Sequence, residues 1–259
     1  MEPLRVQILG VGGAIGKVHK RIFESLGAVV TTDSPDVVSI CTPPEVHYVE
    51  IIDALDQGKA VFCEKPLFWD GRIVLPRLRN IKEHINRRVF MNAPNTAFIN
   101  VIWDKVEYPI KEFTLRFHTN GRHRFKNIAV DLLPHAFSML IHLMGVKEIT
   151  MYKEHCCHEN DYVAYMMYGN TYVKLYFYEG ACEKLLSFSI NDMIFSRVQE
   201  GEGETYRAYT MYEGEKYKVG DPFHASIKEF CDNYEMDGDG FWKAEQNMLM
   251  MAKCLRGEE

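Results

Sequence analysis

The stretch Val6-Gln-Ile-Leu-Gly10-Val-Gly12-Gly13-Ala-Ile-Gly16 decides the fold of the first part of the chain. Its apolar start predicts a buried strand, and its glycines predict a tight turn that leads into a helix over Lys17–Leu26. A glycine-rich turn in that position is the setting of a dinucleotide-binding loop, because the backbone can approach a pyrophosphate and the first N–H groups of the helix are free. The spacing is one residue longer than the usual GxGxxG. The alternative interpretation is a plain tight turn.

Short apolar runs and amphipathic stretches alternate up to about residue 95. Strands are predicted at Val6–Leu9, Ala28–Thr32, Asp36–Cys41, Ala60–Cys63 and Arg88–Met91, and helices at Lys17–Leu26, His47–Gln57 and Arg72–Asn86. This alternation predicts an α/β domain over residues 1–95, of Rossmann type, with a parallel sheet between helices. The domain is abbreviated, because the second strand runs into the third with no helix between them.

The second part of the chain has a different pattern. Strands are predicted at Phe113–His118, Glu148–Lys153, Tyr162–Tyr168, Thr171–Tyr178, Leu185–Ile190 and Tyr206–Tyr212. Gly169-Asn170 predicts a two-residue hairpin turn. A helix over Ala129–Met144 ends at Gly145, and the chain is helical again from Phe223. We therefore expect an α+β domain over residues 96–259, with a mainly antiparallel sheet.

Composition excludes several classes of protein. The chain has 259 residues, 25% of them charged, and a net charge of −6, which is the composition of an ordinary globular protein. It lacks the net positive charge typical of proteins that bind nucleic acid. The short basic stretch Arg122–Lys126 is interpreted as a solvated loop. No apolar run approaches the length of about 18 residues that spans a bilayer. The seven cysteines lack the spacing of a secreted disulfide scaffold, and the first residues lack the features of a signal peptide. Both observations favour a cytoplasmic protein.

The glycine loop supplies the first candidate binding residues. We expect the pyrophosphate of a dinucleotide to lie against Gly10, Gly12, Gly13, Ala14, Ile15 and Gly16. Asp33, 17 residues beyond Gly16, stands near the place where an acid would bind the adenosine ribose. Because Asp33-Ser-Pro is also ordinary turn chemistry, Asp33 is either a ribose ligand or a turn residue.

Further motifs lie where predicted strands end, at the edge where parallel sheets bind ligands. They are Cys41-Thr-Pro-Pro-Glu-Val-His47 and Glu64-Lys-Pro-Leu67, and a later helical motif is Asp131-Leu-Leu-Pro-His135. Together with the glycine loop and His19, they resemble the glucose–fructose oxidoreductase / inositol dehydrogenase / MocA family of NAD(P)-dependent oxidoreductases. The resemblance covers residues 1–95 and 129–145, and beyond them it depends on architecture alone.

This resemblance implies an enzyme that transfers a hydride between a nicotinamide and a secondary alcohol or ketone of a sugar, a cyclitol or a related small polar substrate. The implied cofactor is NAD or NADP. Lys65 would contact substrate and nicotinamide, and Asp131 and His135 would orient the substrate and relay its proton. Their spacing of four places both on one helix face. The cofactor site would also include Thr42, Pro43, His47, Glu64 and Lys65.

The chain departs from the family pattern at two positions on the motif helix. Leu133 replaces a glycine, Ser138 replaces an acid, and the chain is shorter than family members usually are. These changes leave an alternative open: a member without turnover that uses the pocket as a ligand or cofactor sensor.

Two further patterns bear on metals and partners. His155-Cys-Cys-His158 cannot direct four ligands to one point from a strand, so we expect no metal. Tyr172, Tyr176 and Tyr178 share one face of a predicted strand. Such a face suits partner contact, and the open sheet face of the resembling family often forms dimers, so we expect a homo-oligomer.

Overall fold

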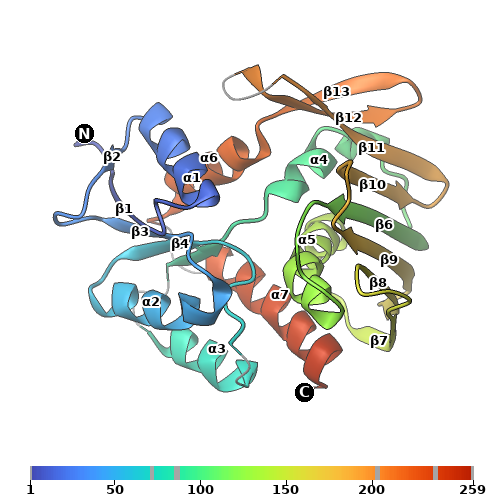
Figure 1. Ribbon diagram of the computed structural model, residues 1–259, viewed down its shortest axis with the longest axis horizontal. Coiled ribbons are helices and arrows are strands. Elements are labelled where there is room, and N and C mark those ends of the chain that lie inside the picture. Colours follow the sequence, from blue (N-terminus) through green and yellow to red (C-terminus); the bar gives the residue numbers. More distant parts are fainter. Residues whose placement is uncertain (1, 71–72, 85–87, 202–204, 236–238, 258–259) are drawn as a thin grey trace. The chain divides into compact units, whose positions relative to one another are not determined.

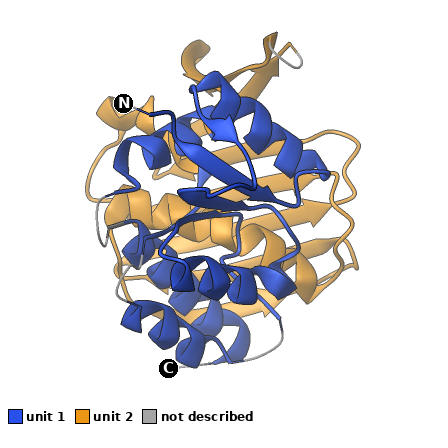
Figure 2. Ribbon diagram, turned by 90° about the vertical axis from the view of Figure 1, so that its left-hand side faces the viewer, with its two compact units in different colours: residues 1–94, 223–259 blue, residues 95–222 orange. Residues whose placement is uncertain are grey.

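A computed structural model describes residues 2–70, 73–84, 88–201, 205–235 and 239–257 of the chain (Figure 1). The chain divides into two compact units, which are described separately. The first comprises Met1–Pro94 together with Phe223–Glu259, and the second comprises Asn95–Pro222 (Figure 2). Both termini therefore belong to the first unit.

The first unit is built on a five-stranded, wholly parallel sheet in the order β2-β1-β3-β4-β5. Its strands are β1 (Arg5–Leu9), β2 (Val29–Val30), β3 (Val37–Ile40), β4 (Ala60–Cys63) and β5 (Val89–Met91), and its helices are α1 (Ala14–Ser25), α2 (Pro44–Asp56), α3 (Val74–Glu83), α6 (Pro222–Asn233) and α7 (Asp239–Arg256). Every residue of β3 and β4 is buried, as expected for central strands of a parallel sheet. The predicted Rossmann-type α/β fold is confirmed.

The strand β2 is shorter than the sequence predicts. Ala28–Thr32 is a β-branched run, but only Val29 and Val30 pair with β1. The chain then returns directly to Val37, with no helix between β2 and β3. Arg72–Asn86 is likewise longer than α3, although residues 72 and 85–86 lie outside the described part.

The expected division into residues 1–95 and 96–259 differs from the observed one at the last two helices, which belong to the first unit. Phe230 of α6 lies against the rings of Phe62 and Phe90, with centroids 5.0 and 5.1 Å apart. On α7, a Cβ atom at Gly240 would come within 2.3 Å of the Phe90 ring, so this helix approaches β5 closely. The apolar face of a helix predicts that it covers a sheet, but not which sheet, so the sequence could not assign residues 223–259 to the first unit.

The second unit contains an eight-stranded sheet in the order β13-β12-β11-β10-β6-β9-β8-β7. The strands are β6 (Glu112–Thr119), β7 (Ile149–His155), β8 (Asp161–Tyr168), β9 (Thr171–Glu179), β10 (Leu185–Ile190), β11 (Met193–Glu200), β12 (Arg207–Tyr212) and β13 (Glu215–Gly220). All neighbours are antiparallel except β6 and β9, so the mainly antiparallel sheet is confirmed. The sequence analysis missed β11 and β13, which follow tight turns and carry many polar residues.

One long helix, α5 (Lys126–Met144), covers β8 and β9 of this sheet. By length and composition it could cross a membrane, but 67% of its apolar window is buried inside the protein, which is the position of a core helix. Shorter helical turns precede the sheet: Pro94–Thr96, α4 (Ala97–Asn100) and Trp103–Lys105. The strands β8 and β9 bury alternate residues against the core. Tyr172 and Tyr178 lie exposed on the outer face of these strands. The homo-oligomer stays a prediction.

Candidate functional site

The glycine loop follows β1, and two of its glycines are required by the fold itself. Gly10 has a φ of +76°, and a Cβ atom there would lie 2.7 Å from the carbonyl oxygen of Cys41. A Cβ atom at Gly16 would lie 2.2 Å from the carbonyl oxygen of Gly10. The Gly13 N–H donates to that same Gly10 oxygen over 3.0 Å. The turn is therefore closed tightly on itself, and α1 starts directly against the end of β1.

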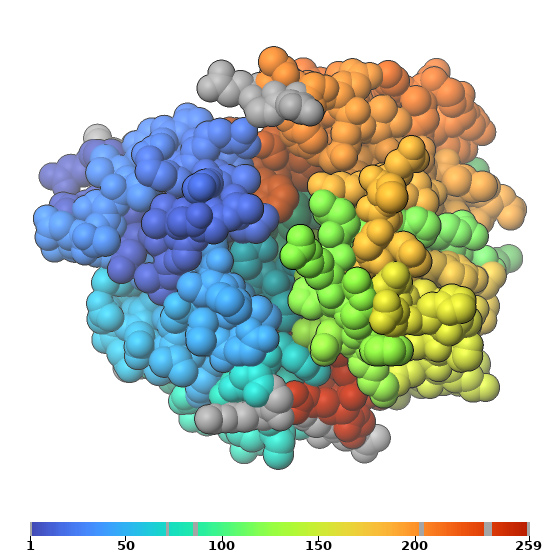
Figure 3. Space-filling model, viewed as in Figure 1, coloured from blue at the N-terminus to red at the C-terminus, as the bar shows by residue number. Residues whose placement is uncertain are grey.

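Gly12 differs from these two, because nothing lies within 4 Å of the position that its Cβ atom would occupy. The packing of the chain gives no reason for a glycine there. The neighbouring Val11 and Ile15 are 41% and 38% exposed, and the N-terminal segment of the first unit lies at the surface in Figure 3. A bare, exposed backbone at this position leaves room for a bound group to approach, which is what a pyrophosphate requires.

The first turn of α1 offers free hydrogen-bond donors beside Gly12. The helix begins at Ala14, and its first backbone bond runs from Lys17 N–H to the carbonyl of Gly13 over 3.1 Å. Among the described residues, no side chain caps this end, and the first turn carries no acid. The N–H groups of Ala14, Ile15 and Gly16 therefore have no acceptor within the helix, and the positive end of the helix dipole is open to an anion. The loop fits a dinucleotide phosphate.

Asp33 takes no part in this arrangement. One guanidinium nitrogen of Arg5 lies 3.4 Å from a carboxylate oxygen of Asp33 and also donates to its backbone carbonyl. Arg5 begins β1, whereas the glycine loop follows the opposite end of that strand, about 13 Å away at 3.3 Å per residue. The Asp33 side chain is 88% exposed, so its contact with Arg5 does not distinguish a turn residue from a ribose ligand, and both interpretations stay predictions.

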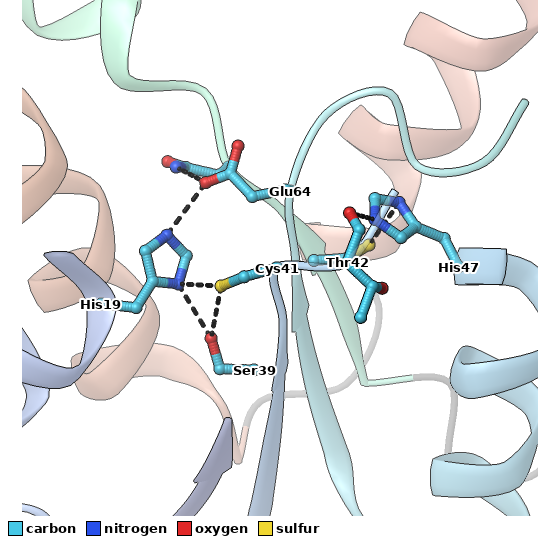
Figure 4. A network of polar contacts seen from close by, with 8 residues as sticks. His19, Ser39, Cys41, Thr42, His47 and Glu64 are labelled. Atoms are coloured by element: carbon cyan, nitrogen blue, oxygen red, sulfur yellow. Dashed lines mark hydrogen bonds and ion pairs between the residues drawn. The ribbon is translucent and has the colours of Figure 1, made fainter. Parts of the chain in front are cut away.

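A buried network fastens α1 to the carboxyl edge of the sheet (Figure 4). His19 of α1 is fully buried, and its Nε2 donates to Glu64 Oε1 over 2.9 Å. Its Nδ1 lies 2.9 Å from the hydroxyl oxygen of Ser39 in β3. Asn92, just after β5, donates to the same Glu64 oxygen over 2.6 Å. Three elements of the fold thus meet at the Glu64 carboxylate, and β3 joins the network through His19.

The electrostatics of Glu64 follow from these partners. Burial alone would raise its pKa, but the hydrogen bonds from His19 and Asn92, together with the charges of His19 and Lys65, lower the pKa below its ordinary value. Glu64 is therefore an ionised carboxylate that accepts two hydrogen bonds at Oε1. By contrast, burial and the charge of Glu64 raise the pKa of the Cys41 thiol to about 12, so Cys41 is not a thiolate nucleophile.

His47 connects the two motif segments at this edge. Its Nε2 lies 2.7 Å from the carbonyl oxygen of Thr42, and its Nδ1 lies 3.1 Å from that of Pro66. The Thr42 hydroxyl bonds the carboxylate of Glu50 on α2. These contacts hold the Thr42–Pro43 and Lys65–Pro66 segments together. The half-buried Lys65 therefore stands on a backbone that is fixed from both sides.

The structure thus brings most of the predicted cofactor residues to one edge of the first unit. The loop residues 10–16, Thr42, Pro43, His47, Glu64 and Lys65 all follow β1, β3 or β4 at their carboxyl ends or lie at the start of the next helix. Sequence analysis missed Ser39, Glu50 and Asn92. A signal existed for Ser39, which is a polar residue inside a strand whose four positions are all buried.

The remaining predicted residues lie on α5 in the second unit. Asp131 is half-buried, and His135, four residues later, is 9% exposed, with its ring 5.3 Å from that of Phe117. The two departures from the family pattern, Leu133 and Ser138, are both buried in this unit. The catalytic roles predicted for Asp131 and His135 stay predictions.

The motif His155-Cys-Cys-His158 provides no metal site in the described structure. His155 ends β7, and Cys157 and His158 are exposed. The group of metal-ligating side chains that does come together among the described residues lies elsewhere in the second unit and comprises His123, Asp131 and Glu179.

Comparison with known proteins identifies the family of the N-terminal segment. Residues 16–86 match the model of the glucose–fructose oxidoreductase / inositol dehydrogenase / MocA family, described as an oxidoreductase family with an NAD-binding Rossmann fold. This match confirms the predicted resemblance. The D-glucoside 3-dehydrogenase of Escherichia coli is 32% identical over an alignment of 97 residues, which covers 25% of this chain and 28% of that protein. The chain therefore aligns with less than a third of this curated relative.

Solved structures resemble the chain over nearly its whole length. UDP-N-acetylglucosamine 3-dehydrogenase GnnA from Acidithiobacillus ferrooxidans has a TM-score of 0.74 at 16% identity, covering 97% of this chain and 96% of its own. The WlbA (WbpB) dehydrogenase from Thermus thermophilus, solved with NAD and UDP-GlcNAcA, has a TM-score of 0.69 at 16% identity, covering 96% and 94%. At these identities the likeness establishes the fold.

Substituting Gly12 and Gly16 separates a binding role from a folding role. Gly12→Ala has space for its methyl group, so we expect unchanged stability and at least tenfold weaker binding of NADH or NADPH, measured by nicotinamide fluorescence. Gly16→Ala meets the Gly10 carbonyl, so it should destabilise the protein by about 2–3 kcal/mol in denaturant unfolding. Equal cofactor affinity in wild type and Gly12→Ala would contradict the pyrophosphate assignment.

The lowered pKa of Glu64 predicts how stability depends on pH. A carboxyl whose pKa is lower in the folded protein stabilises it above the ordinary value of 4.5, and this stabilisation is lost as pH falls through the folded-state pKa. Glu64→Gln should reduce the free energy of unfolding at pH 7 by about 2 kcal/mol and flatten its decline below pH 4.5. Urea unfolding at several pH values measures both effects. The exposed Glu45→Gln serves as control, and identical pH slopes in wild type and Glu64→Gln would refute the network.

Proposed function

We propose that this chain is an NAD(P)-dependent oxidoreductase that transfers a hydride between nicotinamide and a secondary alcohol or ketone of a sugar or related polyol. The observation that carries the proposal is the open backbone at Gly12 beside the uncapped start of α1. The Lys65 motif supports it, because it stands at the same edge of the sheet. When bound, the nicotinamide supplies the acceptor or donor of the hydride.

The chain itself would bind the cofactor mainly through its pyrophosphate. Backbone N–H groups at the start of α1 would donate hydrogen bonds to the phosphate oxygens. The Thr42–Pro43 and Glu64–Lys65 segments would lie beside the nicotinamide half. On the adenosine side the domain is reduced to the two-residue β2, and Asp33 is the carboxylate predicted there. The affinity of the chain should therefore depend strongly on the glycine loop.

Lys65 would move the proton of the substrate. When an alcohol is oxidised, a hydride leaves the carbinol carbon and the hydroxyl proton must pass to a base. The amine of Lys65 in its neutral form would accept this proton, and in its charged form it would return the proton during ketone reduction. His47 and Glu64 act as positioning residues, since they hold the backbone on either side of Lys65. Asp131 and His135 would orient the substrate, as the family resemblance implies.

The names of the relatives direct the choice of substrate. One acts as a D-glucoside 3-dehydrogenase and another as a UDP-N-acetylglucosamine 3-dehydrogenase. Both names specify position 3 of a sugar linked to a further group. We therefore propose glycosides and nucleotide sugars as the first substrate classes for this chain.

A second candidate function is a sensor that binds the cofactor or ligand without turnover. The two-residue β2 favours it, because the adenosine side of the domain is reduced. Leu133 and Ser138 favour it as well, since both are buried where the family pattern has glycine and an acid. A sensor would bind the cofactor, but it would not oxidise any alcohol of these classes.

Lys65→Met tests the catalytic role of the lysine. With an active glycoside or nucleotide sugar, we expect its kcat, followed by nicotinamide absorbance, to fall by about 100-fold or more, because the proton has lost its acceptor. Cofactor affinity should fall less than in Gly12→Ala, because the pyrophosphate binds at the glycine loop. Lys59→Met, at the other end of the same strand, is the matched control and should keep the activity of the wild type. Unchanged turnover in Lys65→Met would exclude the role, and cofactor binding without turnover in the wild type would favour the sensor.

A further inference from the structure

A buried carboxylate in the second unit has no part in the redox proposal. Glu179 is the last residue of β9 and continues the buried alternation of that strand after Val173, Leu175 and Phe177. It is fully buried. A Cβ atom at Gly121 would lie 2.2 Å from Glu179 Oε2, so the loop before α5 closes directly over the carboxylate and needs a glycine to do so. A charged group in this position requires compensation.

Two further ligand-bearing side chains meet Glu179. Asp131 comes from α5 and His123 from the covering loop, and one ligand atom of each of the three residues lies within 4.8 Å of the others. The backbone N–H of His123 donates to Glu179 Oε2 over 2.6 Å. Oε1 of Glu179 is buried and has no hydrogen-bond partner among the described residues. Burial raises the pKa of Glu179, and the neighbouring charge of Asp131 raises it further. Two carboxylates and an imidazole thus point ligand atoms at one small region.

The loop that carries His123 is fixed at both ends. The N–H of Gly121 donates to the Thr119 hydroxyl over 3.1 Å, and the N–H of Phe125 donates to the carbonyl of Glu159 over 2.9 Å. On the strand side, β6 places Thr119 opposite Glu179, and the backbone N–H of Glu179 donates to the carbonyl of Asn160, which directly precedes β8. These neighbours are uncharged, so the described contacts on the strand side leave the negative charge of Glu179 unbalanced.

We propose that His123, Asp131 and Glu179 form a binding site for a divalent transition-metal cation of the Zn²⁺ or Mn²⁺ class. The donor set of one imidazole nitrogen and two carboxylate oxygens suits these ions, whereas Mg²⁺ and Ca²⁺ prefer oxygen alone. A dication neutralises two carboxylates and gives Glu179 Oε1 a partner. Three protein ligands leave at least one coordination position for water or a substrate oxygen.

This proposal shares Asp131 with the redox proposal, in which the same residue would orient the substrate, but it is tested separately. All three ligands lie in the second unit, whereas the cofactor loop and Lys65 lie in the first. Metal content is measured without a substrate or a nicotinamide. Absence of bound metal would therefore leave the cofactor loop and Lys65 unaffected, and absence of cofactor binding would leave the metal site unaffected.

Metal binding by the full chain tests the site. Protein stripped with EDTA is titrated separately with Zn²⁺, Mn²⁺, Mg²⁺ and Ca²⁺, and bound metal and melting temperature are measured after gel filtration. We expect one Zn²⁺ or Mn²⁺ per chain, a raised melting temperature, and at least tenfold weaker binding in Glu179→Gln. His123→Ala removes a ligand at an exposed position, so it keeps the test valid if Glu179→Gln fails to fold.

Two control variants locate the cation. Glu112→Gln removes a carboxylate elsewhere on the same sheet, and His155→Ala removes an imidazole from the His155–His158 segment. Both should bind as the wild type does. Binding lost in His155→Ala but kept in Glu179→Gln would place the cation at that segment and overturn the proposal. Absence of stoichiometric metal in the wild type would also overturn it and would mean that Asp131 and Glu179 share a proton instead.

Discussion

The hydrogen bond between His19 and Glu64 is the contact on which the candidate cofactor site depends. It joins α1 to the end of β4 inside the first unit, and Ser39 and Asn92 complete it from β3 and the end of β5. The start of α1, the glycine loop and the Lys65 segment therefore keep one geometry. A buried carboxylate is costly unless it is fully hydrogen-bonded, so this network specifies how these elements meet as well as stabilising them.

Much of this geometry could be predicted from the sequence, because the signals are local. Gly10 and Gly16 are necessary for a tight strand-to-helix turn, and buried runs mark β3 and β4. The reduced β2 was foreseen as a missing helix, although its length was overestimated, since β-branched residues favour a strand without fixing how many of them find a partner. Asp33 was left between two interpretations, and its exposed contact with Arg5 does not distinguish them.

Long-range relations were beyond the sequence. Residues 223–259 return to the first unit through ring contacts of Phe230 that no local pattern specifies. His123 and Glu179 lie 56 positions apart, and they meet because β6 and β9 pair in parallel and the chain after β6 folds back over the end of β9. The alternation in β9 did contain a signal, since it continues to Glu179 and places a carboxylate on the core side.

The account is tested most directly by amide hydrogen exchange of the whole chain with and without saturating NADH or NADPH. Because the loop and the motif segments form one edge, the account predicts that one of the two cofactors slows exchange in residues 10–17 and around Thr42 and Lys65. Exchange in the strands β7 and β8 of the second unit should stay unchanged. Exchange in residues 10–17 that is unaffected by either cofactor would contradict the central claim that this loop binds a dinucleotide.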